Sequence, residues 1–295
     1  MLRTSGESVD SLDQPSSVPA SSQESIGLHL RDYACAELGS SIAHLSWRGG
    51  RLHEGVHLAR KSLRRTRATI ELGGCALGSG ASLIDRELRR ANRSLSKLRD
   101  AHATLHALDQ LVSRNAGDEH ALQALRRIRT TAARVRAACL RSVLAGDPRL
   151  QDRLGVLAIL RAALPALAWA AVDPALVEAA IGRTRLAADD AGAKACQSGR
   201  DDDWHAWRRR ARRLSQQQRA RGDVIAKSAG KREKRLAILL GEAQDYAMLR
   251  ERAGRKSPFA RDDRDLLRSL ATDAIADLRK CVARISTKEP AATPK

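Results

Sequence analysis

The segment LHEGVHLARKSLRRTRATIEL, residues 52–72, predicts a helix that is apolar on one face and cationic beside it. Its apolar residues recur every three or four positions, which places them on one side of an α-helix. His57, Arg60 and Arg64 follow the same spacing on the neighbouring stripe. The segment is therefore expected to pack against a core and to carry positive charge along the edge of that core. The apolar positions are Leu52, Val56, Ala59, Leu63, Thr66 and Ile70.

The cationic stripe recurs about half a chain later, with the same spacing between its members. The matched pairs are His57 with His205, Arg60 with Arg208, Lys61 with Arg209, Arg64 with Arg212 and Arg65 with Arg213. The segments LSKLRD at 95–100 and LGEAQD at 240–245 continue the repeat at a slightly shorter offset. That alignment matches Arg86, Arg89 and Arg90 with Lys231, Lys234 and Arg235. Two linked repeats indicate a duplication of helical hairpins, which would bring the basic stripes towards one groove about a pseudo-twofold axis.

The rest of the chain also has helical periodicity, and no stretch alternates polar and apolar residues as a strand would. Asp-Pro pairs at 147–148 and 173–174 each predict a capping residue followed by a helix-starting proline. The fold class is therefore all-α. A disordered polar tail is expected at 1–26 and a second polar tail at 287–295. The further helices are expected over about 27–47, 81–111, 119–144, from 148, from 174, after 201–203, over 224–253 and over 261–285.

The composition points to a polyanionic partner. The 295 residues carry a net charge of +19, which suits nucleic acid, an anionic membrane or a phosphate polymer. Only 2% of the residues are aromatic, whereas proteins that hold single-stranded nucleic acid commonly stack its bases on aromatic rings. Five separate cysteines without a C-x-x-C pair argue against a disulfide framework or a zinc ribbon, so a cytoplasmic chain is expected.

The longest apolar stretch runs from Val156 to Val172. Arg161 and Pro165 interrupt it, and it is too short to span a bilayer. No membrane insertion is expected, and the stretch is interpreted as a buried helix.

The repeated motifs resemble one known family. The pattern H-x-x-R-x-x-x-R-R-x-R at 57–67, the following L-x-K-L-R-D at 95–100 and their second-half echoes are similar to the CHAD domain, the conserved histidine α-helical domain. The resemblance covers 27–286, with a first half at about 27–147 and a second half at about 148–286. It implies two four-helix bundles related by approximate twofold symmetry, with a basic central groove that binds inorganic polyphosphate. It also implies a cytoplasmic location at polyphosphate granules, with granule-associated proteins as further candidate partners.

The residues expected to bind polyphosphate are the cations and histidines of the repeated stripes. They are His57, Arg60, Lys61, Arg64, Arg65, Arg67, Arg86, Arg89, Arg90, Arg93, Lys97, His205, Arg208, Arg209, Arg212, Arg213, Lys231, Lys234 and Arg235. The second copy has Ser215, Glu242 and Gln244 where the first has cations, so it is expected to contribute fewer contacts. Protonation of the two histidines by a neighbouring polyanion is expected to tighten binding as the pH falls from about 8 to about 6.

Non-enzymatic binding is expected, with no catalytic residue, no metal and no cofactor. The chain has no G-x-x-x-x-G-K-[ST] loop, and it lacks the E-x-E-x-K strand motif of the triphosphatase domain that many members of the resembled family carry. The run Asp201–Asp203 directly precedes a helix, and helix capping explains it better than a magnesium site. Two alternatives stay open: a basic helical protein that binds RNA or the ribosome, and a phosphohydrolase that acts on polyphosphate.

Overall fold

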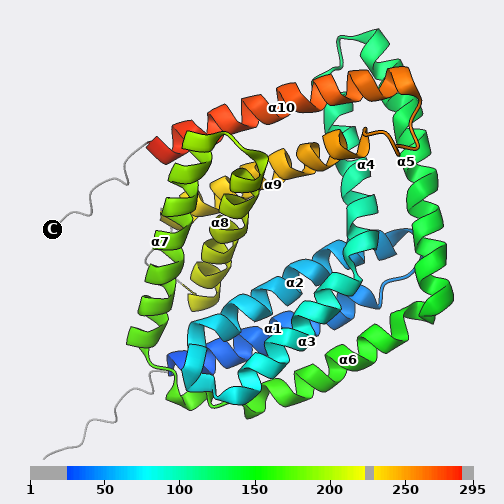
Figure 1. Ribbon diagram of the computed structural model, residues 1–295. Helices are drawn as coiled ribbons and strands as arrows, with labels where there is room; N and C mark the ends of the chain where they lie inside the picture. Colours follow the sequence, from blue (N-terminus) through cyan, green and yellow to red (C-terminus); the bar gives the residue numbers. More distant parts are fainter. Residues whose placement is uncertain (1–24, 223–228, 288–295) are drawn as a thin grey trace, which may run out of the picture.

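The computed structural model describes residues 25–222 and 229–287, and every regular element within these ranges is helical. The all-α prediction is confirmed. In Figure 1, α10, α5, α6 and α7 form the outer frame of the molecule, and α2, α4, α8 and α9 cross the space inside it. The helices are α1 (Ile26–Leu45), α2 (Leu52–Gly73), α3 (Ser79–Ser94), α4 (Ser96–Arg114), α5 (Glu119–Gly146), α6 (Gln151–Ala163), α7 (Pro174–Ser198), α8 (Asp201–Arg221), α9 (Ala229–Arg252) and α10 (Arg261–Thr287).

The two predicted tails lie outside the described residues, apart from the positions where they meet the helices. Ile26 already begins α1, and Thr287 is the last residue of α10. The described helices therefore begin one residue before, and end one residue after, the expected range 27–286.

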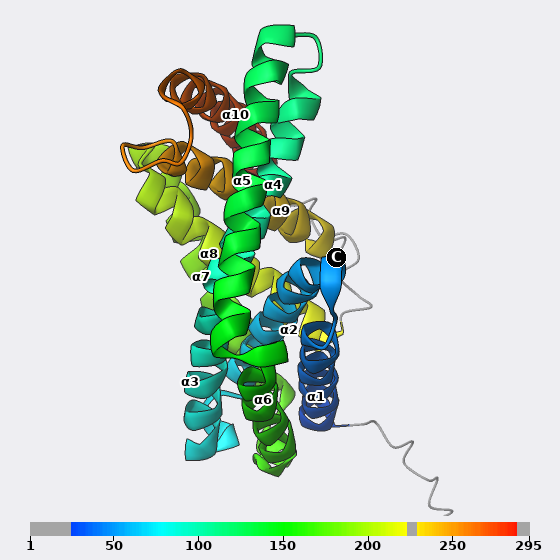
Figure 2. The ribbon, with the colours of Figure 1, turned by 90° about the vertical axis from the view of Figure 1, so that its right-hand side faces the viewer.

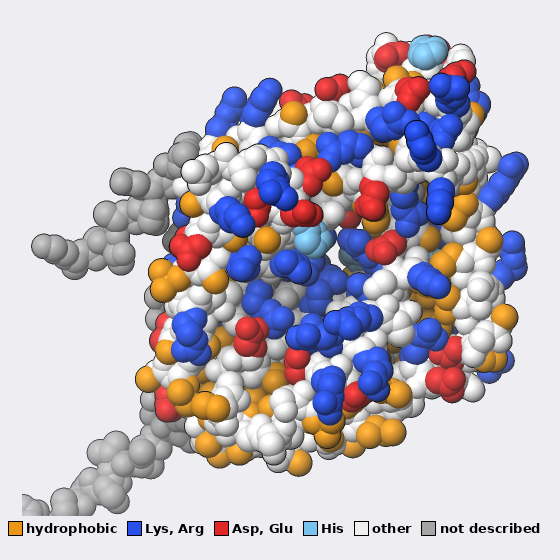
Figure 3. Space-filling model, in the orientation of Figure 1, with side chains coloured by type: hydrophobic (Ala, Val, Ile, Leu, Met, Phe, Trp, Pro, Cys, Tyr) orange, Lys and Arg blue, Asp and Glu red, His pale blue; other side chains and the backbone are white. Residues whose placement is uncertain are grey.

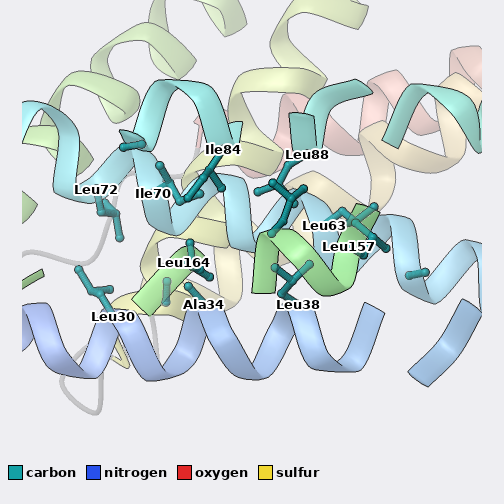
Figure 4. Packing of buried hydrophobic residues seen from close by; sticks show 14 of the residues in the cluster. Leu30, Ala34, Leu38, Leu63, Ile70, Leu72, Ile84, Leu88, Leu157 and Leu164 are labelled. Atoms are coloured by element: carbon teal, nitrogen blue, oxygen red, sulfur yellow. The ribbon is translucent and has the colours of Figure 1, made fainter. Parts of the chain in front are cut away.

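The largest core lies between α1, α2, α3 and α6, as Figure 4 shows. Its fully buried side chains include Leu38 of α1, Leu63 of α2, Leu88 of α3 and Leu157 of α6. Full burial of one such side chain stabilises the fold by roughly 1.5–3 kcal/mol. All six apolar positions expected on the face of α2 are buried, so this core holds α2 and the cations at its edge in a fixed orientation.

A second core joins helices that are distant in the sequence. Leu108 of α4 and Leu125 of α5 pack in one cluster with Leu249 of α9 and Leu267 of α10. A third, smaller cluster around Trp207 joins α7 and α8 to α9 and α10. These clusters do not follow the expected division between 147 and 148, because α6 packs on α1 and α3 while α9 and α10 pack with α4 and α5. The two pseudo-twofold bundles therefore stay a prediction.

The single helix expected over 81–111 is wrong, because the chain bends at Leu95 between α3 and α4. Leu95 has φ −90° and ψ 0°, which ends the α3 hydrogen-bond ladder and starts a new one. The Arg60 guanidinium of α2 donates to the Asn92 carbonyl in the last turn of α3 and to the Ser96 hydroxyl, at 3.1 Å, in the first turn of α4. A side chain that takes carbonyls from the ladder in this way is an ordinary cause of a kink.

The acidic residues expected at helix starts are found there, although not all act as caps. Asp173 accepts a hydrogen bond from the Leu176 amide at 2.8 Å and confirms the cap of α7. At the start of α8 the capping position is Arg200, and Asp201 instead pairs with Arg279 of α10 at 2.6 Å. Carboxylates in the first turn still suit the positive end of the helix dipole.

The interpretation of 156–172 as a buried helix is only partly right. Leu157, Leu160 and Leu164 of this stretch are buried against α1 and α3, but the opposite side of α6 is exposed. Ile159 is 70% exposed and Val156 is 42% exposed. Hydropathy alone cannot distinguish a helix buried on all sides from one buried on a single side.

Candidate functional site

A basic cavity opens between α2 and α8, with α3 and the start of α4 beside it. Its volume is about 650 Å³. Figure 3 shows Lys and Arg side chains gathered around a hollow in the middle of this face of the molecule. The residues lining it are Arg60, Arg64, Arg67, Arg89, Asn92, Arg93, Arg99, His205, Arg208, Arg209, Arg212, Arg213 and Gln216. No Asp or Glu is among them. We refer to this site as the arginine cavity.

The two repeated stripes form the opposite walls of the arginine cavity because α2 and α8 pack against each other. Arg64 comes from α2, and Arg208 and Arg212 come from α8. Burial lowers the pKa of Arg64 well below its ordinary value, and Arg212 is the strongest of the neighbouring cations that add to this effect. Burial and then Arg208 lower the pKa of Arg212 to about 9. The free protein therefore holds desolvated positive charges close together. An anion bound in the cavity would reduce the repulsion between them.

Five arginines of the cavity have no partner within the part of the chain that the structure describes. They make neither a hydrogen bond nor an ion pair there, so their N–H donors are available to a ligand. The Nε atoms of Arg64 and Arg208 are buried without a hydrogen bond, which is costly for a charged group. These arginines are Arg64, Arg93, Arg208, Arg209 and Arg212.

The other arginines of the cavity are held in place by the protein itself. Arg67 makes a two-pronged ion pair with Asp85 at 2.7 Å and 3.1 Å. Arg99 bridges Asp100 and Asp245, each at 3.0 Å, and so links α4 to α9. Arg213 pairs with Glu71. Their guanidinium groups keep positive charge at the rim, but their geometry is fixed by carboxylates rather than free to follow a ligand.

The structure brings together ten of the expected binding residues and leaves nine outside the cavity. Lys61 and Arg65 follow Arg60 and Arg64 by one position, which rotates them by about 100° around α2 and away from the cavity. Arg65 instead pairs with Glu37 of α1 at 2.9 Å. Those outside are His57, Lys61, Arg65, Arg86, Arg90, Lys97, Lys231, Lys234 and Arg235. Except for Arg65, all of them are exposed.

Three residues that line the cavity were not expected there: Asn92, Arg99 and Gln216. Arg99 belongs to the L-x-K-L-R-D motif, whose expected binding residue is Lys97. The bend at Leu95 changes the rotation of α4 relative to α3, so Arg99 lines the cavity and Lys97 is exposed outside it. The motif correctly indicates this segment of the chain as part of the site. The assumption of one continuous helix over 81–111, however, favours Lys97 over Arg99 as the residue that faces the cavity.

The two repeated histidines differ in their surroundings. His205 lines the cavity, and its Nδ1 lies 2.6 Å from the Gln244 side-chain oxygen of α9. His57 lies beside the ring of His102, with the ring centres 6.2 Å apart. Although its ring keeps an exposed edge, desolvation and then Arg64 lower the pKa of His57 to about 4. His57 is therefore uncharged from pH 6 to pH 8 in the free protein, and the expected tightening over that range requires a bound anion to raise its pKa.

A third histidine gives a testable dependence of stability on pH. His53 is 6% exposed, and burial followed by Arg136 lowers its pKa to about 4. At pH values between about 4 and the ordinary pKa of 6.5, His53 binds a proton in the unfolded chain but not in the folded protein. Acidification through this range therefore favours unfolding. We expect the free energy of unfolding to fall from pH 7.5 to about pH 5, with His53 contributing roughly 2 kcal/mol of that loss.

Urea unfolding followed by circular dichroism at both pH values measures this dependence. The variant His53→Gln removes the titrating group and should lose correspondingly less stability on acidification. An equal loss in the variant and the wild type would show that burial of His53 does not contribute.

Comparison with known proteins agrees with this architecture. The described helices include none with the length and apolarity needed to cross a membrane. None of the curated proteins matches the chain. Among solved structures, PptA from Streptomyces chartreusis has a similar fold, with a TM-score of 0.59 and 21% sequence identity over 89% of this chain and 99% of that chain. The family model of the CHAD domain matches residues 34–254. Because that segment spans most of the sequence, the chain belongs to the CHAD domain family.

Proposed function

We propose that this protein binds inorganic polyphosphate in the arginine cavity without acting on it chemically. The observation that carries the proposal is the set of five arginines that meet in one cavity without an anionic partner among the described residues. Membership of the CHAD domain family supports the choice of a phosphate polymer as the ligand. The few aromatic residues of the chain support a ligand without bases to stack.

The chemistry of guanidinium groups suits this ligand. Each offers a planar fork of N–H donors that can grip two oxygens of one phosphate group. Arg64 on one wall and Arg208 and Arg212 on the other can contact successive phosphates of a chain that lies between α2 and α8. The anion relieves the repulsion among the desolvated cations, and its condensed counterions are released into solution.

The donor set of the cavity favours binding over hydrolysis. Enzymes that cleave phosphoanhydrides commonly hold divalent cations on carboxylates beside the phosphates. Among the residues that the structure describes, the lining of the arginine cavity contains no carboxylate, and the nearby Asp100 and Asp245 are both bound to Arg99. We therefore propose a binding protein located at polyphosphate granules, where granule-associated proteins would be its neighbours.

Competition between two polyanions tests the proposed function. A fluorescent long-chain polyphosphate is bound first, and unlabelled polyphosphate or single-stranded RNA is then added at equal phosphate concentration. We expect polyphosphate to displace the probe at least about tenfold more effectively, because its closely spaced charges fit the adjacent arginines and RNA gains nothing from stacking. More effective displacement by RNA would overturn the assignment in favour of an RNA-binding protein.

The same preparation distinguishes binding from hydrolysis. The protein is incubated with long-chain polyphosphate and Mg²⁺, and orthophosphate release and chain length are followed. We expect neither to change, and catalytic shortening of the chain would show a phosphohydrolase instead.

A further inference from the structure

His205 stands between the arginine cavity and a second hollow of about 440 Å³. The second hollow lies between the first turns of α8 and the C-terminal half of α9, with α10 beside it. Among the described residues, His205 is the one that lines both spaces. Helix α9 packs against α8 and against α4, and Figure 2 shows these three helices behind α5.

One nitrogen of the His205 ring is engaged by the protein and the other is not. Nδ1 lies 2.6 Å from Oε1 of Gln244, a residue that lines the second hollow and not the arginine cavity. Because an amide oxygen can only accept, Nδ1 carries the hydrogen of this bond, and Nε2 of the neutral ring has a free lone pair. Nε2 has no hydrogen-bond partner among the described residues, and it is not one of their buried unpartnered atoms, so a ligand can reach it.

A neutral ring held in this way is a poor neighbour for a phosphate chain. The lone pair on Nε2 repels the phosphate oxygens that the arginines attract. A protonated ring instead donates a hydrogen bond from Nε2 and adds a positive charge. Protonation leaves the bond from Nδ1 to Gln244 in place, because both nitrogens of a charged imidazole are donors. The charged ring therefore fits without rearrangement at Gln244.

We propose that a phosphate chain bound in the arginine cavity draws one proton onto Nε2 of His205, and that Gln244 is the residue that positions this imidazole. The proton comes from the solvent and returns to it when the chain leaves. The inference rests on the proposed function, and it makes polyphosphate binding dependent on proton uptake at a single site.

The charges on the two sides of His205 explain why the ligand controls this proton. The side of the arginine cavity is cationic, and Arg99 is the one cation there that Asp100 and Asp245 already bind. A bound phosphate chain brings negative charge to that side, which favours a proton on Nε2. The cations that face His205 from this side are Arg99 of α4, Arg208 and Arg209 of α8, and Arg60 and Arg64 of α2 across the cavity.

The side of the second hollow changes little when the cavity is filled. Asp201 is bound there by both Arg250 of α9 and Arg279 of α10. Asp202 and Glu251 are exposed, so solvent screens their charges. None of these groups takes the place of Gln244 at Nδ1.

The first copy of the repeat lacks this arrangement. At the position that corresponds to Gln244 it has Arg99, a cation that cannot accept a hydrogen bond from an imidazole. Desolvation, Arg64, His102 and then Arg99 lower the pKa of His57 to about 4, and His57 lies outside the cavity. The proton uptake is therefore assigned to His205 and not to its counterpart.

Titration calorimetry in buffers of different ionisation enthalpy measures the proton uptake directly. Long-chain polyphosphate is titrated at pH 7.5 in HEPES, MOPS and Tris at one ionic strength. We expect wild type to take up roughly 0.5 to 1 proton per molecule of protein that binds. The matched control His57→Gln should take up the same amount, and His205→Gln should take up none. Gln244→Glu places a carboxylate at Nδ1 that favours the charged ring before the ligand arrives, so its uptake should fall towards zero.

A measurement without polyphosphate tests the role of Gln244 by itself. Nitrogen-15 NMR of the histidine side chains at pH 8 reports which ring nitrogen carries the hydrogen. We expect the Nδ1–H form for His205 in wild type and a shift towards the Nε2–H form in Gln244→Met, which keeps the length of the side chain but removes the acceptor. A merely structural role of Gln244 would leave this ratio unchanged.

Three results would overturn the inference. Wild type could bind polyphosphate without proton uptake, His205→Gln could take up as much as wild type, or the free protein could carry the hydrogen of His205 on Nε2. Each of these leaves polyphosphate binding itself intact. Absence of binding in wild type would instead refute the proposed function and this inference with it, so the two failures are distinguishable.

Discussion

Reversing two charges, with Arg64→Glu and Arg212→Glu together, is expected to lower the affinity for long-chain polyphosphate by about 150- to 25,000-fold. The two arginines stand on opposite walls of the arginine cavity and have no partner among the described residues. A hydrogen bond to a charged group contributes about 1.5–3 kcal/mol, so the loss of two such contacts gives that range. Isothermal titration calorimetry or fluorescence anisotropy measures the change.

A second double variant separates the cavity from the overall charge. Arg134→Glu with Arg141→Glu changes the net charge equally, and both residues are exposed on α5, outside the cavity. We expect the control to lose less than about tenfold in affinity, through long-range attraction alone. Both variants should keep the helical circular dichroism signal, because a glutamate among the remaining arginines of the cavity gains ion-pair partners. Equal losses in the two double variants would contradict a specific cavity.

Much of the fold could be predicted from periodicity because the buried face of α2 is encoded within α2 itself. Leu52, Val56 and Leu63 recur at helical spacing, and the structure buries all three. The bend at Leu95 could not be predicted in this way, since it depends on Arg60, which comes from another helix and reaches the ladder there. A cause that lies 35 residues away in the sequence leaves no local signal.

The candidate site shows the same limit. The repeat identified α2 and α8 as its walls, and Arg60, Arg64, Arg208 and Arg212 line the cavity as expected. The repeat could not show that Arg65 faces α1, because the carboxylate that holds it there belongs to Glu37. Charge patterns therefore locate the helices of a basic site, while the acids of neighbouring helices determine which cations remain available.

Residues 156–172 illustrate a different ambiguity. Apolar content correctly indicated packing, yet it could not show that the packing is on one side only. The side that α1 and α3 leave uncovered follows from the three-dimensional arrangement of three helices.

A steep dependence on salt is the second large effect that the arginine cavity predicts. Polyphosphate carries closely spaced charges and condensed counterions, as a single-stranded nucleic acid does. The number of counterions released on binding is proportional to the number of phosphates that the protein neutralises. Five arginines without described partners give a slope of about −3.5 for the logarithm of the association constant against the logarithm of salt concentration. A tenfold increase in salt should therefore weaken binding about 3,000-fold.

Titrations across a series of NaCl concentrations measure the slope for wild type and for Arg212→Ala. The variant removes one contact, so its slope should be shallower by about 0.7, whereas Arg134→Ala on the exposed side of α5 should keep the wild-type slope. This difference separates contacts inside the cavity from diffuse attraction, because diffuse attraction responds alike to the loss of either arginine. A wild-type slope near zero would contradict binding by counterion release, and identical slopes in the two variants would place the phosphate contacts elsewhere on the molecule.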